Sequence, residues 1–235
     1  MRRSWLLVPA SKAEQVAAAP RAGADVIVLD LVELVAEEDK FETRERLQGA
    51  VAAVSAGGVE VFVQIDPELC YADLHACVWP GLAGVVVSRA ESPQQIVEID
   101  EQLGRLEHER GILPGALKIV AALETARGNH AAYDIARTSP RVCGLTLGRP
   151  DLVMDLRPEP SGEIHLMPYL MQRLIIIARA AGVTPVGAWW RAPDRGLLAT
   201  PEHSYQAGQR GRAIGFKGAM CLRANQVEPL NRAYS

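Results

Sequence analysis

The sequence has few aromatic residues, little cysteine and no surplus of either charge. Aromatic side chains make up 5% of the 235 residues, and the formal net charge of −3 argues against the basic surface that binds nucleic acids. No apolar run approaches the roughly 20 residues that cross a membrane. The first apolar run ends at Pro9, too early for a signal peptide. We therefore expect a soluble, cytoplasmic protein.

Several common site motifs are also missing from the sequence. The four cysteines form no C-x-x-C pair and have no histidine at zinc-ligand spacing, so buried, reduced thiols are expected rather than a zinc site. Neither G-x-G-x-x-G nor a P-loop sequence occurs, which argues against a nucleotide-binding protein. No serine stands in a G-x-S-x-G context, which argues against a serine hydrolase.

The chain does contain a regular alternation of apolar runs and helical segments. Some runs, such as Ala24–Leu31, are apolar almost throughout, as strands buried on both faces are. The predicted strands are 4–8, 24–31, 59–65, 82–87, 117–123, 142–147, 183–189 and 218–222. This alternation predicts parallel strands with right-handed crossovers, and eight such units close as a (β/α)8 TIM barrel. A doubly wound open sheet is the alternative.

Local signals predict where two of the helices begin. Ser11, with Glu14 three residues later, has the pattern of a capping box, so a helix is expected from Lys12. A strongly apolar helix is expected from Pro168 to Ala181, after a turn-rich loop over 157–162.

Two acids follow neighbouring predicted strands. The run Ile119–Leu123 ends at Glu124, and the next strand is followed by Asp151. Parallel α/β folds carry their chemistry at such strand ends, so the two carboxylates are expected to lie close together. Carboxylate oxygens with room for water suit Mg²⁺. The alternative is that each acid only stabilises the N-terminus of the following helix.

Six blocks of the chain, in order, resemble the motifs of the HpcH/HpaI aldolase and citrate lyase beta-subunit superfamily. They are SWLLVPAS, AGADVIVLDLVELVAEEDK, GVVVSRAES, ALETARG with LTLGRPDLVMDL, ARAAGVTPVGAWW and GFKGAMCLRANQV. One block would be weak evidence, but six in the family's order are strong evidence for fold and ancestry.

The resemblance implies a barrel of the phosphoenolpyruvate/pyruvate-binding type, in one domain over residues 1–235, without the C-terminal tail of many relatives. It implies a carbon–carbon lyase or aldolase that uses Mg²⁺ or Mn²⁺ and acts through a metal-stabilised enolate. The implied substrates are hydroxy-acids, oxo-acids or their CoA thioesters. The family assembles as trimers or hexamers, so a homo-oligomer is expected, with no nucleic acid or membrane as partner.

The resemblance also assigns roles to residues. The metal ligands are Glu124 and Asp151, which agrees with their places after two strands. The catalytic group comprises Asp30, Gln64 and Arg89. Beyond the resemblance, we expect Arg149 and Arg223 to be new cationic groups that hold an anionic substrate, with Pro9 as a further substrate contact.

Several positions depart from the family pattern. An acid of the family falls on Val32, an arginine on Gln64, a further acid on Gly187 or Ala188, and a histidine on Arg223. A glutamine amide is uncharged and cannot form the charged, bidentate hydrogen bonds that a guanidinium forms with a carboxylate. The losses at 32 and 64 look coupled, since either charge alone would lack its partner, so an arginine restored at 64 is expected to be destabilising. Two functions follow: an active lyase with a different substrate, or a catalytically degenerate paralogue that serves as a subunit or binding protein.

Overall fold

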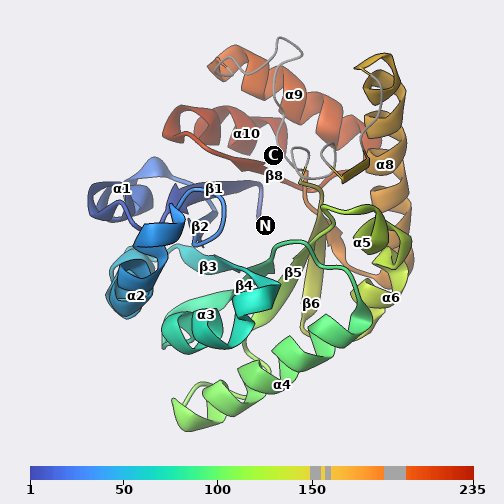
Figure 1. Ribbon diagram of the computed structural model, residues 1–235. Helices are drawn as coiled ribbons and strands as arrows, with labels where there is room; N and C mark the ends of the chain where they lie inside the picture. The colour runs from blue at the N-terminus through green and yellow to red at the C-terminus, as the bar shows by residue number, and fades with distance from the viewer. Residues whose placement is uncertain (149–154, 157–159, 188–199) are drawn as a thin grey trace.

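The computed structural model describes residues 1–148, 155–156, 160–187 and 200–235, and within these the side chains of 160–166 are left out. Arg149, Asp151 and Ala188 therefore lie outside the described residues. The described part forms one ring of parallel strands surrounded by helices, as Figure 1 shows.

The strands form one parallel sheet in the order β7-β6-β5-β4-β3-β2-β1-β8. They are β1 (Ser4–Pro9), β2 (Val26–Asp30), β3 (Glu60–Ile65), β4 (Leu82–Val87), β5 (Lys118–Ala122), β6 (Val142–Thr146), β7 (Thr184–Pro185) and β8 (Ala219–Cys221). A parallel bridge between Gly187 and Ala219 joins the two outer strands, and Met220 donates to the Gly187 carbonyl at 2.8 Å. The sheet thus closes on itself, and the predicted (β/α)8 barrel is confirmed.

The helices cover the outside of the ring (Figure 1). The α-helices are α1 (Ala13–Ala18), α2 (Lys40–Ser55), α3 (Cys70–Cys77), α4 (Pro93–Glu109), α5 (Ala126–His130), α6 (Ala132–Arg137), α8 (Pro160–Ala181), α9 (Pro201–Ile214) and α10 (Val227–Ala233). Short 3-10 turns are η1 (Ala19–Ala22), η2 (Glu37–Asp39), η3 (Pro67–Leu69) and η4 (Ala224–Gln226). No helix in these described ranges is both long and apolar enough to cross a membrane.

The strands bury side chains on both faces, as their apolar sequences predict. Outward side chains pack against the helices in the larger core. Inward side chains fill the barrel, with the rings of Trp5 and Phe62 5.1 Å apart at their centroids. The inward set is Trp5, Leu7, Val26, Val28, Phe62, Val86, Val120, Ala122, Val186 and Met220.

Two of the predicted helix starts are wrong. Lys12 precedes α1, and no side chain caps this helix. The capping box stands instead at α4, where Ser92 accepts from the Gln95 N–H and the Gln95 side chain accepts from the Ser92 N–H. Helix α8 begins at Pro160 and runs through Pro168, so at least residues 160–162 of the expected loop are helical.

Candidate active site

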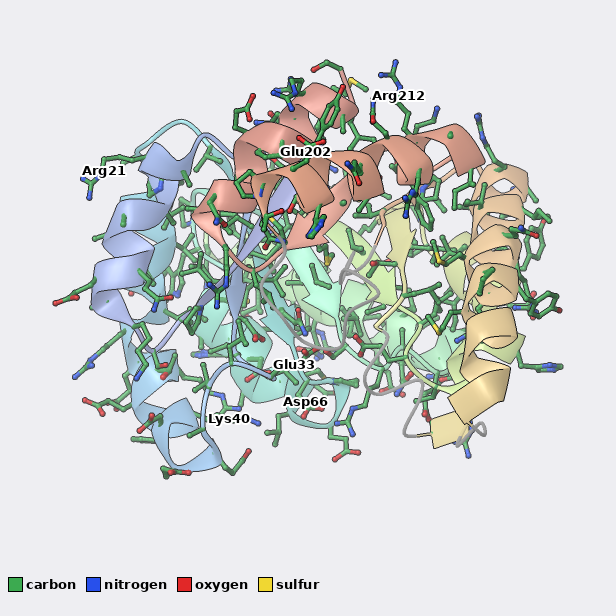
Figure 2. The ribbon with its side chains drawn as sticks, turned by 90° about the horizontal axis from the view of Figure 1, so that it is seen from above. Arg21, Glu33, Lys40, Asp66, Glu202 and Arg212 are labelled. Atoms are coloured by element: carbon green, nitrogen blue, oxygen red, sulfur yellow. The ribbon has the colours of Figure 1, made fainter. Side chains whose placement is uncertain are left out.

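Predicted site residues gather at the carboxyl ends of adjacent strands. Pro9 of β1 pairs in register with Asp30 of β2, and Asp30 pairs with Gln64 of β3. These positions continue the inward-facing series of their strands, because strand side chains alternate between faces. In the view of Figure 2, Glu33 and Asp66 are labelled in the lower half of the molecule, and Arg21 and Arg212 in the upper half.

Asp30 holds the loop that follows β2. Its carboxylate accepts from the backbone N–H groups of Val32 (2.8 Å), Glu33 (3.3 Å) and Leu34 (2.7 Å). Burial raises the pKa of Asp30, and these N–H donors act against that shift. Because three donors already occupy the carboxylate, the structure gives Asp30 a positioning role, and its catalytic role stays a prediction.

Gln64 belongs to a hydrogen-bond chain that the sequence did not reveal. Its Nε2 donates to Ser88 Oγ at 2.9 Å and to Glu33 Oε1 at 3.2 Å, and both Gln64 and Ser88 are buried. An acid therefore lies beside position 64, although Val32 is not that acid. The expectation that a cation at 64 would lack a partner is wrong, because the acid is supplied by Glu33, one residue further along the loop.

Arg89 connects the ends of three strands. It follows β4, and its backbone N–H donates to Glu124 Oε2 at 2.7 Å. Its guanidinium contacts both carboxylate oxygens of Asp66, after β3, at 3.2 and 3.3 Å. Within the described residues Arg89 is the one non-glycine with positive φ, at 44°. Strained backbone of this kind often occurs at functional sites, and here it points the N–H at Glu124.

A buried carboxylate supports the loop that carries Asp66. Asp73 of α3 is 1% exposed and accepts from the Asp66 N–H at 2.9 Å. Arg44 of α2 donates to the other oxygen of Asp73 at 2.7 Å. Burial raises the pKa of Asp73, and these two donors oppose it. The place of Asp66, and through it the guanidinium of Arg89, is thus tied to the helical layer.

Glu124 lies where β5 and β6 end. It is 3% exposed, and Gly148, just after β6, approaches so closely that a Cβ there would be 2.2 Å from Glu124 Oε1. One layer deeper, Thr146 is buried, and its hydroxyl has no hydrogen-bond partner among the described residues. The fixed carboxylate of Glu124 is an oxygen ligand of the kind that hard divalent cations take.

Two further predictions concern Arg223 and the metal pair. Arg223 follows β8 at the same end of the barrel and is exposed, and its N–H donates to Gln226 Oε1 at 3.1 Å. Within the described ranges, no three His, Cys, Asp or Glu side chains form a group that could hold a metal ion. The predicted metal pair includes Asp151, which lies outside them, so that pair stays a prediction.

Sequence reasoning missed Glu33, Asp66, Ser88 and Gly148 as neighbours of the site. Each follows a predicted strand within a few residues, which was the available signal. Glu33 was not predicted because the family's acid aligns with Val32, one residue earlier in the sequence. Gly148 carries no chemistry of its own, so only its contact with Glu124 identifies it.

Comparison with known proteins gives a family. The family model for HpcH/HpaI aldolase/citrate lyase matches residues 3–224. Citrate lyase subunit beta of Escherichia coli strain K12 is 28% identical over all of this chain and 77% of its own length. The (3S)-malyl-CoA thioesterase of Cereibacter sphaeroides strain ATCC 17029 is also 28% identical, over 99% of this chain and 77% of its own length.

Solved structures share the fold. A citrate lyase beta subunit from M. tuberculosis, complexed with oxaloacetate and magnesium, has a TM-score of 0.74 at 23% identity and covers 98% of this chain and 96% of its own. Malate synthase of Haloferax volcanii has a TM-score of 0.82 at 19% identity, over 98% of this chain and 72% of its own.

Proposed function

This chain belongs to the HpcH/HpaI aldolase/citrate lyase family, and we propose that it is a carbon–carbon lyase or aldolase dependent on Mg²⁺ or Mn²⁺. The observation that carries the proposal is the placement of Glu124. Its buried carboxylate accepts a hydrogen bond from the Arg89 N–H at the carboxyl end of the barrel and lies against Gly148. Lyase-type relatives in the family support the reaction class, and the specific chemistry is our inference.

Glu124 and Asp151 would hold the cation. The choice of Asp151 rests on the family resemblance, since the residue lies outside the described ranges. When bound, the cation supplies Lewis-acid stabilisation of the negative charge that develops on a substrate oxygen. The magnesium in the M. tuberculosis relative supports the choice of metal.

Arg89 is proposed to bind the anionic end of the substrate. Its side chain is 41% exposed, and its contacts with Asp66, at 3.2 and 3.3 Å, are longer than the roughly 2.7–2.9 Å of a strong charge-assisted bond. A substrate carboxylate can therefore compete for the guanidinium. Arg149 and Arg223 follow other strands at the same end and are proposed as further cationic contacts, and Pro9 as an apolar one.

Gln64 narrows the substrate class. Both of its described hydrogen bonds go to protein oxygens, and its amide is uncharged, so it offers little to a second carboxylate. We therefore propose a hydroxy-acid, or its CoA thioester, with fewer carboxylates than citrate has.

The alternative is a catalytically degenerate paralogue that acts as a subunit or binding protein. The same Gln64 favours it, because the family arginine is gone and the amide is bonded into the wall of the barrel. Under this alternative the mouth still binds an oxo-acid, but no bond is cleaved.

A substrate screen separates the two. Purified protein with Mg²⁺ is offered 3-hydroxy-acids, their CoA thioesters and 2-oxo acids, and both cleavage and condensation are followed. We expect turnover with at least one compound, which is lost in Glu124→Gln, while Glu202→Gln on α9 is the matched control. Binding of an oxo-acid without turnover of any compound would favour the degenerate paralogue.

We also propose one catalytic domain spanning the sequence, a homo-oligomeric assembly and a cytoplasmic location. The first rests on the barrel that the described residues form, the second on the family resemblance, and the third on the sequence expectation given above. Light scattering at micromolar concentration checks the assembly, and a monomer would contradict it.

A further inference from the structure

A cavity opens at the end of the barrel opposite Glu124. It has a volume of about 500 Å³ and lies where the amino ends of β1, β5, β6 and β7 meet. Its apolar wall includes Trp5, Val120 and Val186. Ligand pockets are commonly 300–1,000 Å³ and mostly apolar, with a few polar groups that orient the ligand.

The cavity exists because the inward positions here carry little side-chain volume. Gly144 of β6 contributes none, and a Cβ built there would meet Thr184 O at 3.1 Å and Val120 Cγ2 at 3.5 Å. Strand β7 is only Thr184–Pro185, so it adds few inward side chains. In most barrels this layer is filled by bulky branched residues, so an open space of this size needs a reason.

The polar groups of the cavity carry a cationic surplus. Arg2 is paired with Glu60 at 2.6 Å, and its guanidinium also covers the Trp5 and Phe62 rings at 5.7 and 5.2 Å. Lys217 stands at the rim, and among the described residues its ammonium has no ion pair or hydrogen bond. Among the described residues that line the cavity, Glu60 is the one acid, and it is neutralised by Arg2, so Lys217 leaves a net positive charge.

We propose that this cavity is a second small-molecule site, for an amphipathic monocarboxylate whose apolar body packs on Trp5, Val120 and Val186 and whose carboxylate meets Lys217. The inference does not rest on the proposed lyase function. Along β5, Val120 and Glu124 are four residues apart, about 13 Å, with Ala122 between them, so the two ends are distinct sites.

Cys143 provides a local probe of this site. Its thiol lies in the cavity wall, 3.6 Å from Arg2 Nη1, and is the one partly exposed cysteine of the four. Burial raises the pKa of the Cys143 thiol, with Arg2 opposing, so alkylation is slow at neutral pH and is best followed above pH 8. Cys70, Cys77 and Cys221 are buried and react later.

The experiment measures how 3-phenylpropanoate protects Cys143 from iodoacetamide, with calorimetry to give the dissociation constant. Cys143→Ser controls the assignment of the labelled thiol. Neutral 3-phenylpropanamide controls for charge. Lys217→Gln, a surface change, removes the cation without altering the core, and Gly144→Val fills the cavity.

We expect millimolar or tighter binding of the acid and slower labelling of Cys143. Lys217→Gln should weaken the acid about two- to fivefold, the range of an exposed ion pair, and leave the amide unchanged. Gly144→Val should abolish binding of both. The proposal is overturned if the acid neither binds nor protects Cys143 in the wild type, or if Lys217→Gln weakens acid and amide equally.

Discussion

Two of the arginine–carboxylate pairs of the barrel differ in burial and in the distance between their charged groups. Arg141 is 9% exposed and meets Glu107, which is fully buried, at 2.7 Å. Glu107 also accepts from the backbone N–H groups of Gly115 and Leu117, so its oxygens are saturated. Arg89 is 41% exposed and meets Asp66 at 3.2 Å, at the mouth of the barrel. The first pair holds α4 to β5 and β6, whereas the second can exchange partners, which is what a binding site requires.

The largest expected effect follows from breaking the buried pair. Glu107→Ala leaves the guanidinium of Arg141 buried with only Asp100 as its ionic partner, which should cost about 3–5 kcal/mol of unfolding free energy. Urea denaturation measures this cost. The double change Glu107→Leu with Arg141→Met should recover most of the loss, because no unpaired charge remains. A loss below about 1 kcal/mol for the single change would mean that the pair is no more structural than a surface pair.

Gly148→Ala tests the other end of the comparison. The added Cβ would lie 2.2 Å from Glu124 Oε1, so the carboxylate must move. We expect activity on whichever substrate the wild type turns over to fall about ten- to a hundredfold, since a shift of about 1 Å can cost that much, with the fold intact. Gly49→Ala in α2, where a Cβ meets nothing within 4 Å, is the matched control and should keep full activity. Equal activity in both variants would remove Glu124 from the site.

The pH dependence of stability should report Glu107. Burial acts to raise its pKa, but hydrogen bonds from Arg141 and from the Leu117 and Gly115 N–H groups hold the pKa of Glu107 below its ordinary value. Its contribution to stability is therefore complete above about pH 4.3, the unfolded pKa, and is lost as pH falls through the lower folded value. Thermal melts below pH 5 should show a steeper decline for the wild type than for the Glu107→Leu, Arg141→Met double variant. If the melting temperatures of the two proteins fell equally below pH 5, the proposed contribution of Glu107 would be contradicted.

The smallest effect is expected for Gln64→Arg. Gln64 is buried and Glu33 Oε1 lies 3.2 Å from its Nε2, so a guanidinium there is desolvated but has a carboxylate beside it. Its loss of stability should be smaller than the roughly 3–5 kcal/mol of an unpaired buried charge. Gln64→Arg combined with Glu33→Gln should be less stable than either single variant, because the new cation loses its partner. Thermal melts of the three proteins decide this. Simple additivity would show that residues 33 and 64 do not interact.

The sequence predicted the strands and the position of Glu124 well, because both depend on local patterns. The apolar run before Glu124 and the inward–outward alternation of β5 already fix which end of the barrel it occupies. The partnership of Gln64 with Glu33 was not predictable in this way, since it depends on how Asp30 folds the following loop. The cavity at Gly144 was missed for a similar reason, because a void results from several strands together and leaves no motif.

Calorimetry of metal and oxo-acid binding tests the proposed site most directly. Protein with saturating Mg²⁺ is titrated with oxaloacetate, in the wild type and in Asp151→Ala, with Glu202→Gln as the control. We expect Asp151→Ala to lose most of the Mg²⁺-dependent binding, because Mg²⁺ held by Glu124 alone would keep nearly all of its waters. Identical Mg²⁺-dependent binding by the wild type and Asp151→Ala would contradict a metal site built from Glu124 and Asp151.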